Sequence, residues 1–359
     1  MKALLTAGGR ATRLRPITWT LNKHLIPLAN KPMLGYAIEK LVDAGITEIG
    51  INVNAGDTEI AAAFGDGSKF GAKLSYLEQP GGPLGIAHAV NAQQAFLGDE
   101  PFIFFLGDNI VLGSLKRFVD KFEAEKLNCL LALSRVKNPN RFGVPVFNEA
   151  GKITSVEEKP ANPKSQYAVT GIYVYDKSFF EAFKHIQPSP RGEFEISDIH
   201  TWLLQNNYNV GHEEITGWWK DTGNPEDLLE GNALFLNELP VEKVIMQGEV
   251  MDGAVIQGKV SIGAGTKIGP RVLIRGPVVI GEGCIINDAY IGPYTAIGNS
   301  VTVDGTEIEH SIVFDGAAIR ANKRIVDSLI GKNAVVTKVE ESLPHGHKLV
   351  VGDHARVEL

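Results

Sequence analysis

The sequence predicts an α/β domain with a mainly parallel sheet, followed by a parallel β-helix. Up to about residue 240, short apolar runs alternate with amphipathic segments, and beyond it β-branched residues recur every six positions. Alternating strands and helices are typical of crossover units that build a parallel sheet with helices on both faces. Glycine changes frequency at the same place, with 16 in the last 119 residues against 23 in the first 240. We therefore predict two domains, residues 1–240 and 241–359.

Seven segments of the first domain have patterns that predict their secondary structure. Apolar runs predict strands at Lys2–Thr6, Glu48–Val53, Phe102–Leu106 and Cys129–Val136. Apolar residues at helical spacing predict helices at Lys31–Gly45, Gly85–Leu97 and Ser114–Lys126. In the first of these helices, Pro32 suits the first turn and Gly45 a C-terminal stop. Because ligands bind outside the carboxyl ends of parallel strands, we expect the chemistry just after Thr6 and Leu106.

Aliphatic residues six positions apart dominate the second domain. They are Val244, Val250, Ile256, Ile262, Ile268, Ile274, Ile280 and Ile286, and after a five-residue step Ile291, Ile297 and Val303. A period of six fits a triangular coil in which each side is one short strand and every sixth side chain stacks inside. The pattern resembles the left-handed parallel β-helix of hexapeptide-repeat proteins. We expect the less regular tail, Asp304–Leu359, to cover one end of this coil.

The composition argues against several classes of protein. The chain is 44% hydrophobic and 21% charged, as in soluble globular proteins, and its apolar runs fall far short of the roughly 20 residues of a membrane helix. A net charge of −7 argues against nucleic acid as the main partner. The N-terminus lacks a signal-peptide pattern, and Cys129 and Cys284 are the only cysteines. We therefore expect a reducing, cytoplasmic compartment.

A glycine-rich segment follows the first predicted strand. Residues Thr6–Leu14 read TAGGRATRL, so paired glycines expose backbone amides and two arginines follow. Amides and guanidinium groups that converge at a strand end form a phosphate cradle. The segment has neither a Walker sequence nor the dinucleotide fingerprint, and a structural turn with surface arginines is the alternative.

The wider sequence resembles the sugar-1-phosphate nucleotidyltransferases. TAGGRATRLRPIT and NKHLIPLANKPML are followed, in the order of that family, by EQPGGPLGIAHAV, FFLGDN, RFGVPVF, VEEKP, YAVTGIYVYD, RGEFEISD and WWKDTGNPEDLL. Within the family, the chain is most similar to the long-form glucose-1-phosphate thymidylyltransferases, which carry a C-terminal hexapeptide-repeat domain. The resemblance implies a Rossmann-like domain that forms dTDP-glucose and pyrophosphate from dTTP and glucose 1-phosphate. No protein nucleophile is required, because positioning and charge neutralisation carry such a reaction.

The resemblance also implies roles for individual residues. The nucleotide-binding positions are Gly8, Gly9, Thr12, Arg13, Gln79 and Gly85, and the sugar-phosphate-binding positions are Gly143, Glu158, Lys159, Val169 and Arg191. The catalytic residues are Arg13, which steadies the leaving pyrophosphate, Lys23, which contacts the phosphates where attack occurs, and Asp108. For Arg191, a salt bridge within the protein is the alternative role.

Two aspartates are candidates for a magnesium site. Asp108 ends an apolar strand, and Asp221 follows Trp218, Trp219 and Lys220. Magnesium takes hard oxygen ligands, usually one or two carboxylates together with substrate phosphates and water. By resemblance, this pair holds Mg²⁺. The alternative roles are a helix cap for Asp221 and a turn for Asp108.

The sequence is also compatible with other functions. The chain could use UTP or GTP instead of dTTP, or be a noncatalytic nucleotide-sugar sensor or assembly subunit. Many hexapeptide-repeat proteins are acyltransferases, for which His310 is the candidate, although it lies outside the regular repeats. We favour assembly or regulation for the second domain, and expect a homo-oligomer, because stacked rungs offer flat faces for symmetric association. His88 is expected to be a packing residue, whereas His24 either contacts the base or has no role in binding.

Overall fold

The computed structural model describes residues 1–9, 11–82, 84–239, 246–338 and 351–358. The chain forms two compact units. Unit 1 comprises Met1–Arg10 and Leu34–Asp221, and unit 2 comprises Ala11–Met33 and Thr222–Leu359. The predicted domain boundary at residues 240 and 241 lies outside the described residues. Among the described residues, no helix has the length and apolar character needed to span a membrane.

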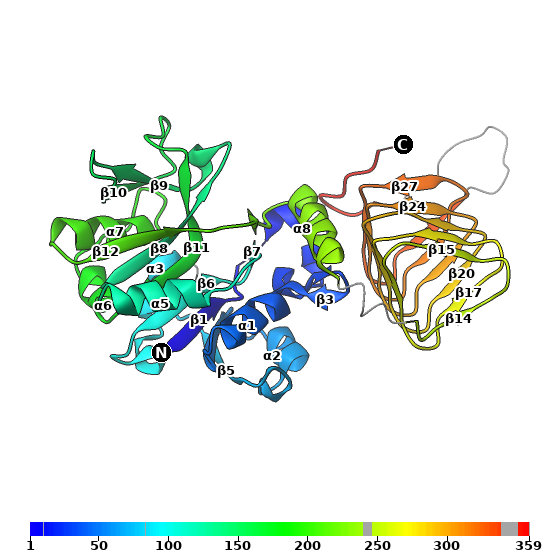
Figure 1. Cartoon of the computed structure of the whole chain (residues 1–359), viewed down its shortest axis with the longest axis horizontal. Coiled ribbons are helices and arrows are strands. Elements are labelled where there is room, and N and C mark those ends of the chain that lie inside the picture. Colours follow the sequence, from blue (N-terminus) through cyan, green and yellow to red (C-terminus); the bar gives the residue numbers. More distant parts are fainter. Residues whose placement is uncertain (10, 83, 240–245, 339–350, 359) are drawn as a thin grey trace. The chain divides into compact units, whose positions relative to one another are not determined.

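Unit 1 is built on a sheet of nine strands (Figure 1). They are β1 (Lys2–Thr6), β4 (Glu48–Val53), β5 (Lys73–Glu78), β6 (Phe102–Leu106), β8 (Cys129–Arg135), β9 (Gly143–Phe147), β10 (Ile153–Glu158), β11 (Tyr167–Tyr175) and β12 (Val210–Glu214). Strands β6, β1, β4 and β5 are successive parallel neighbours, and β12 also pairs in parallel with β8. Strand β11 pairs antiparallel with β6, β8 and β9. The predicted parallel core is confirmed, and the antiparallel strands around β11 extend it.

The helices of the first 221 residues are α1 (Met33–Asp43), α2 (Glu59–Phe64), α3 (Ile86–Asn91), α4 (Gln94–Leu97), α5 (Lys116–Ala124), α6 (Ser178–Phe183) and α7 (Ile196–Gln205), with 3-10 turns η4 (Ser68–Phe70) and η5 (Pro139–Arg141). Those at the three predicted positions are shorter than the sequence predicts, and α2, α6 and α7 are additional. Pro32 lies in a short strand before α1 and not in its first turn. The helix predicted over residues 85–97 divides into α3 and α4 at Gln93, whose side chain donates to Asn52 Oδ1 and to the Glu78 carbonyl.

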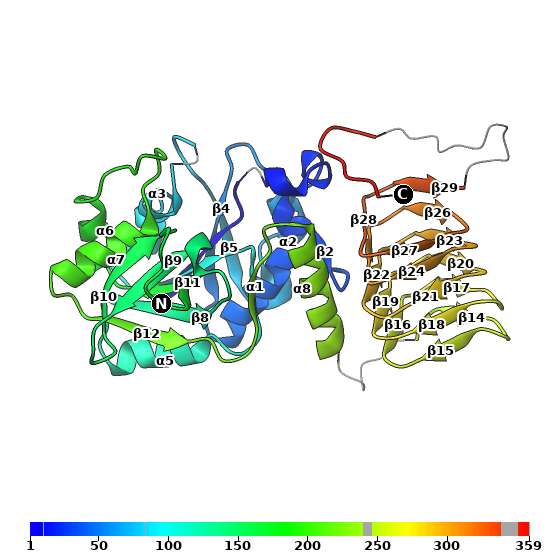
Figure 2. The same cartoon turned by 90° about the horizontal axis from the view of Figure 1, so that it is seen from above.

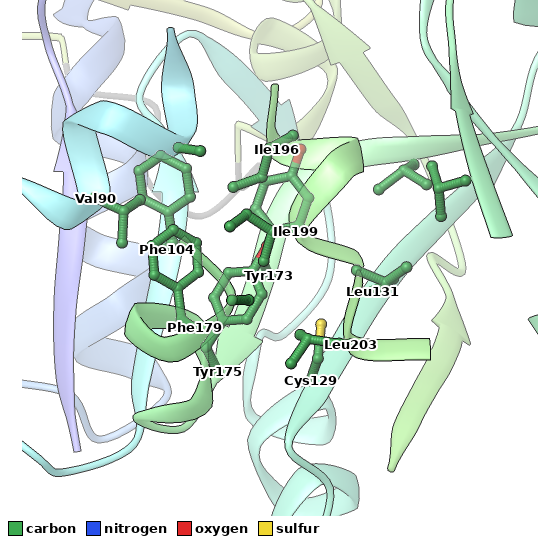
Figure 3. Close-up of a cluster of buried hydrophobic side chains, with 14 of the residues drawn as sticks. Val90, Phe104, Cys129, Leu131, Tyr173, Tyr175, Phe179, Ile196, Ile199 and Leu203 are labelled. Carbon is green, nitrogen blue, oxygen red and sulfur yellow. The ribbon is translucent and has the colours of Figure 1, made fainter. Parts of the chain in front are cut away.

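A hydrophobic core joins the sheet of unit 1 to its helices (Figure 3). Phe104 of β6 and Tyr173 of β11 stack with ring centroids 5.7 Å apart. Tyr175, also on β11, is fully buried and contacts Phe179 of α6 edge to face. His200 of α7 is likewise buried and shares a 2.6 Å hydrogen bond with the Tyr175 hydroxyl. This core fixes β11 and α7 to each other.

Unit 2 contains a left-handed parallel β-helix made of three sheets (Figure 2). The first comprises β14 (Glu249–Val250), β17 (Lys267–Ile268), β20 (Ile285–Asn287), β23 (Thr302–Asp304), β26 (Ala318–Arg320) and β29 (Val335–Thr337). The second comprises β15 (Val255–Gln257), β18 (Leu273–Arg275), β21 (Tyr290–Ile291), β24 (Glu307–Glu309) and β27 (Arg324–Val326). The third comprises β16 (Val260–Ile262), β19 (Val278–Ile280), β22 (Thr295–Ile297), β25 (Ile312–Val313) and β28 (Leu329–Ile330). Each strand pairs in parallel with the strand three further along, as a triangular coil requires.

The predicted stacking residues fill the interior of this coil. Those from Ile262 to Val303 are at most 1% exposed, whereas Val250, in the first rung, is 38% exposed. Val244 lies outside the described residues. The expectation that the less regular tail begins at Asp304 is wrong, because paired rungs continue to Thr337. Residues 339–350 and 359 of that tail lie outside the described residues.

The other segments of unit 2 include those that carry the predicted cationic residues Arg13 and Lys23. The chain from Ala11 forms the 3-10 turns η1 (Thr12–Leu14), η2 (Ile17–Trp19) and η3 (Lys23–Leu25), and the hairpin strands β2 (Pro27–Leu28) and β3 (Lys31–Pro32). Helix α8 (Pro225–Glu238) begins with a cap in which Asn224 Oδ1 accepts the Asp227 amide. Contacts of α8 with both β2 and β22 make these segments one unit with the β-helix.

Candidate functional site

The two predicted metal ligands lie at one end of a short antiparallel ladder. Strand β7 (Asn109–Val111) pairs with β13 (Trp219–Asp221), and Asp221 is opposite Asn109. Asp108 immediately precedes Asn109, so the ladder brings two aspartates that are 113 positions apart in the sequence to neighbouring backbone positions. Among the described residues, no group of three or more His, Cys, Asp and Glu side chains suits a metal ion. Two carboxylates with substrate oxygens still match the ligands that Mg²⁺ takes.

Asn109 organises this end of the ladder, and sequence reasoning did not single it out. Its side chain is 5% exposed, and its Oδ1 accepts hydrogen bonds from Trp219 Nε1 at 2.8 Å and from the Gly171 amide at 3.3 Å. Its Nδ2 donates to Asp108 Oδ1 at 2.9 Å. Asn109 therefore orients Asp108 while it ties β7 to β13 and β11. Its place between a strand-ending aspartate and an apolar pair was the available signal.

The glycine-rich segment turns directly after β1, as predicted. Gly9 has a φ of 110°, a conformation that favours glycine, and its amide donates to Asn54 Oδ1 at 3.1 Å. A Cβ at Gly8 would lie 3.1 Å from the same oxygen. Asn54, which follows β4, thus binds Gly9 from the neighbouring strand and leaves little room for a side chain at Gly8. The sequence did not indicate this role for Asn54.

Gln79 lies in a network of side-chain amides at the end of β5. Its Oε1 accepts a hydrogen bond from Asn52 Nδ2 at 3.3 Å, and its Nε2 lies 3.2 Å from His88 Nδ1. Burial lowers the pKa of His88, which favours the neutral ring that accepts from Gln79. His88 therefore contacts a predicted site residue and is more than a packing residue. The network fixes which way the Gln79 amide faces.

Gly85 has a structural reason to be glycine. Its φ is 101°, and a Cβ there would lie 2.6 Å from the Phe194 carbonyl oxygen. The Phe194 amide donates to the Leu84 carbonyl at 2.8 Å. The loop before α3 is thereby joined to the RGEFEISD segment that carries Arg191.

Three predicted sugar-binding residues occupy one register position of the sheet. Gly143 on β9 pairs with Glu158 on β10 and with Val169 on β11. A Cβ at Gly143 would lie 3.4 Å from Glu158 Oε2 and 3.8 Å from Val169 Cβ. The sheet thus brings these residues together from three strands. The Glu158 carboxylate lies beside Gly143, which has no side chain to fill the adjacent space.

The two predicted sugar-phosphate cations of unit 1 both reach Glu158. Lys159 Nζ lies 3.2 Å and Arg191 Nη2 3.7 Å from Glu158 Oε1. Arg191 also donates to both oxygens of Glu195 at 2.8 Å, and these hydrogen bonds raise its pKa. The salt bridge that sequence analysis left open as an alternative is therefore present. Arg191, Glu158 and Glu195 line a pocket of about 670 Å³ together with Ser189, Asp198 and Trp202.

Three predicted phosphate-site residues belong to unit 2. Thr12 and Arg13 lie on η1, and Lys23 begins η3. The Arg13 guanidinium lies against Gly223, where a Cβ would be 2.9 Å from its Nη1. His24 is 3% exposed, and both its backbone amide and its ring Nδ1 lie 3.0 Å from Asn22 Oδ1.

Comparison with known proteins gives one consistent result. Residues 2–238 match the nucleotidyl transferase family, and residues 259–288 match the bacterial transferase hexapeptide repeat. The chain is 43% identical to a glucose-1-phosphate thymidylyltransferase of Streptomyces griseus, over 100% of this chain and 99% of the relative. It is 41% identical to the low-salt glycan biosynthesis nucleotidyltransferase Agl11 of Haloferax volcanii, over the full length of both. A solved structure assigned as a glucose-1-phosphate thymidylyltransferase from Bacillus anthracis, in complex with sucrose, is similar with a TM-score of 0.61. It is 39% identical and covers 65% of this chain and 94% of its own.

Proposed function

Because the chain belongs to the nucleotidyl transferase family, we propose that it is a glucose-1-phosphate thymidylyltransferase. It would join dTTP and glucose 1-phosphate to give dTDP-glucose and pyrophosphate. The observation that carries this proposal is the similarity, over the whole chain, to relatives with that name. The pairing of β7 with β13, which gathers the two candidate metal ligands, supports it independently.

The reaction forms a bond between a sugar-phosphate oxygen and the α-phosphorus, while the bond from that phosphorus to the bridging oxygen of pyrophosphate breaks. Two anions must approach and a third must leave, so neutralisation of charge is the main task of the protein. Gly8, Gly9 and Thr12 would present the loop to the triphosphate. Arg13 would hold the leaving pyrophosphate, and Lys23 would offset the charge around the phosphorus under attack.

Asp108 and Asp221 would hold Mg²⁺, the metal we propose. Their fit rests on two hard carboxylates at neighbouring positions of one ladder, with Asn109 orienting the first. When bound, the ion would supply further neutralisation of phosphate charge. The Asn109 hydrogen bond fixes the orientation of the Asp108 carboxylate at the end of β6.

Base and sugar would be recognised at separate parts of the sheet. Gln79 would both donate to and accept from the pyrimidine edge, in the orientation fixed by Asn52 and His88. Glu158 would bind sugar hydroxyls beside Gly143. Arg191 and Lys159 would bind the sugar phosphate, which requires that part of their present pairing with carboxylates be exchanged for the phosphate.

We also propose a homo-oligomer in the cytoplasm. The stacked parallel strands of the β-helix support the first proposal, because such stacks offer flat faces for symmetric association. Cys129 and Cys284 are both buried and unpaired, which supports a reducing compartment.

A panel of substrates tests the activity. Pyrophosphate release would be measured with dTTP, UTP, GTP, ATP and CTP against the 1-phosphates of glucose, galactose, mannose and N-acetylglucosamine. We expect kcat/KM to be highest for dTTP with glucose 1-phosphate and to depend on Mg²⁺. A higher kcat/KM with another nucleotide or sugar would replace the substrate assignment. Failure of every pair to release pyrophosphate would exclude the activity itself.

A further inference from the structure

The hairpin that follows Lys23 is fastened to the β-helix by two asparagines. The Asn30 side chain donates from Nδ2 to the carbonyl of Ile297, on strand β22, at 2.6 Å. Asn232, on α8, accepts the Ala29 amide through Oδ1 at 2.8 Å and donates from Nδ2 to the Tyr294 carbonyl at 3.0 Å. Both contacts hold the turn between β2 and β3 against one rung.

The backbone conformation of the turn allows these hydrogen bonds to form in only one arrangement. Ala29 and Asn30 both have positive φ, at 46° and 63°, as in the tight turns that join two-residue hairpins. Asn232 is 0% exposed, so both ends of its amide are satisfied away from water. A buried amide that loses a partner is costly, and the turn is therefore set at one position relative to the β-helix.

A short, continuous set of hydrogen bonds connects this turn to Lys23. The Lys23 carbonyl accepts the Ile26 amide at 3.1 Å, and the Ile26 carbonyl accepts the Met33 amide at 3.1 Å. Ile26, Leu28 and Met33 are at most 1% exposed, so the segment is packed from η3 to the end of the hairpin. A shift at the turn is therefore transmitted to the backbone that carries Lys23.

We propose that Asn30 and Asn232 are positioning residues for the nucleotidyl transfer, through which the β-helix sets the place of Lys23. The inference rests on the proposed role of Lys23 at the phosphates. It assigns the second domain a part in the chemical step, beyond the assembly or regulation expected from the sequence. The two asparagines touch no substrate themselves.

The kinetic test is a double-mutant cycle. Asn30→Gly suits the positive φ and removes the side chain together with its hydrogen bond to Ile297. We expect it to lower kcat about tenfold or more, since small misplacements of a catalytic group have large effects on rate. In a Lys23→Ala background, we expect the same substitution to change kcat less than about twofold, because the group being positioned is gone. An equal loss in both backgrounds would show a general structural effect and overturn the proposal.

A matched control makes the same substitution elsewhere. Asn322 also has a positive φ, 49°, and lies exposed in a later rung of the β-helix. Asn322→Gly should leave kcat within about twofold of the wild type. If Asn322→Gly lowered kcat as much as Asn30→Gly, the loss would come from a general change in the β-helix. That result would overturn the specific role of the turn.

A second readout does not require activity. Native-state hydrogen exchange of the peptide covering residues 22–28 should become about tenfold faster in Asn30→Gly and in Asn232→Ala, and stay unchanged in Asn322→Gly. Unchanged exchange in the first two variants would overturn the proposal even if the wild type proved inactive with every substrate pair. If the wild type were inactive but exchange were faster in the two variants, the proposed function would be wrong. The conclusion that the two asparagines position the segment around Lys23 would still hold.

Discussion

One buried histidine should make unit 1 sensitive to acid. His200 is 0% exposed, and its Nε2 shares a hydrogen bond with the Tyr175 hydroxyl. Its Nδ1 is buried, and no residue in the described part of the chain accepts or donates a hydrogen bond there. Protonation would place a charge in this core, so burial lowers the pKa of His200 from the ordinary 6.5 to about 3.

The sign and size of the effect follow from linkage. Between pH 6.5 and about 3 the unfolded chain binds a proton at this position and the folded chain does not. The stability contributed by neutral His200 is therefore complete above pH 6.5 and is lost as the pH falls towards the folded pKa. From pH 8 to pH 5 the loss amounts to about 2 kcal/mol, with a limiting slope of about 1.4 kcal/mol per pH unit.

Urea unfolding followed by tryptophan fluorescence measures this slope, because Trp202, Trp218 and Trp219 all belong to unit 1. The wild type should lose about 2 kcal/mol more than His200→Gln between pH 8 and pH 5. Ile199→Val, a buried change on the same helix, should cost about 0.5–1.5 kcal/mol at every pH and keep the slope of the wild type. Parallel pH profiles for the wild type and His200→Gln would refute the reasoning.

Three further outcomes test the site. Asp108→Asn and Asp221→Asn should each lower kcat at least about a hundredfold with unfolding unchanged, whereas Asp120→Asn, at an exposed ion pair, should not; near-normal turnover of the first two would remove the metal assignment. Gln79→Ala should reduce the preference for dTTP over UTP and GTP in competition assays, and an unaltered preference would remove Gln79 from base recognition. Gly143→Ala adds a methyl group at ordinary contact distance from Glu158 Oε2, so the fold should tolerate it while the KM for glucose 1-phosphate rises about tenfold; an unchanged KM would place the sugar elsewhere.

The parts of the fold with regular patterns were predictable. Strands β1, β4 and β6 have the predicted bounds, because buried parallel strands are continuous apolar runs. The later rungs were missed since their buried residues, such as Ile308, Val313 and Ile319, change between steps of five and six. A strict six-residue count fails there, although each strand still pairs with the next rung.

Motif order identified the candidate site residues, but not the contacts that hold them. The ladder that joins Asp108 to Asp221 has only three residues in each strand, too few to show a period. Asn54 and Asn109 act through side-chain hydrogen bonds to residues that are distant in the sequence. Such partners depend on the folded sheet, so no local pattern shows which distant residues they bind.

The contacts of the hairpin turn also set the order in which the chain can be completed during synthesis. Ala29 and Asn232 are 203 positions apart, and Asn30 and Ile297 are 267 apart. At a translation rate of about 5–20 residues per second, the turn leaves the ribosome roughly 10 to 50 seconds before its partners. The hairpin that follows Lys23 can therefore form these contacts only after strand β22 has emerged from the ribosome. If the ribosome stalls before that point, the nascent chain lacks the contacts that position the backbone around Lys23.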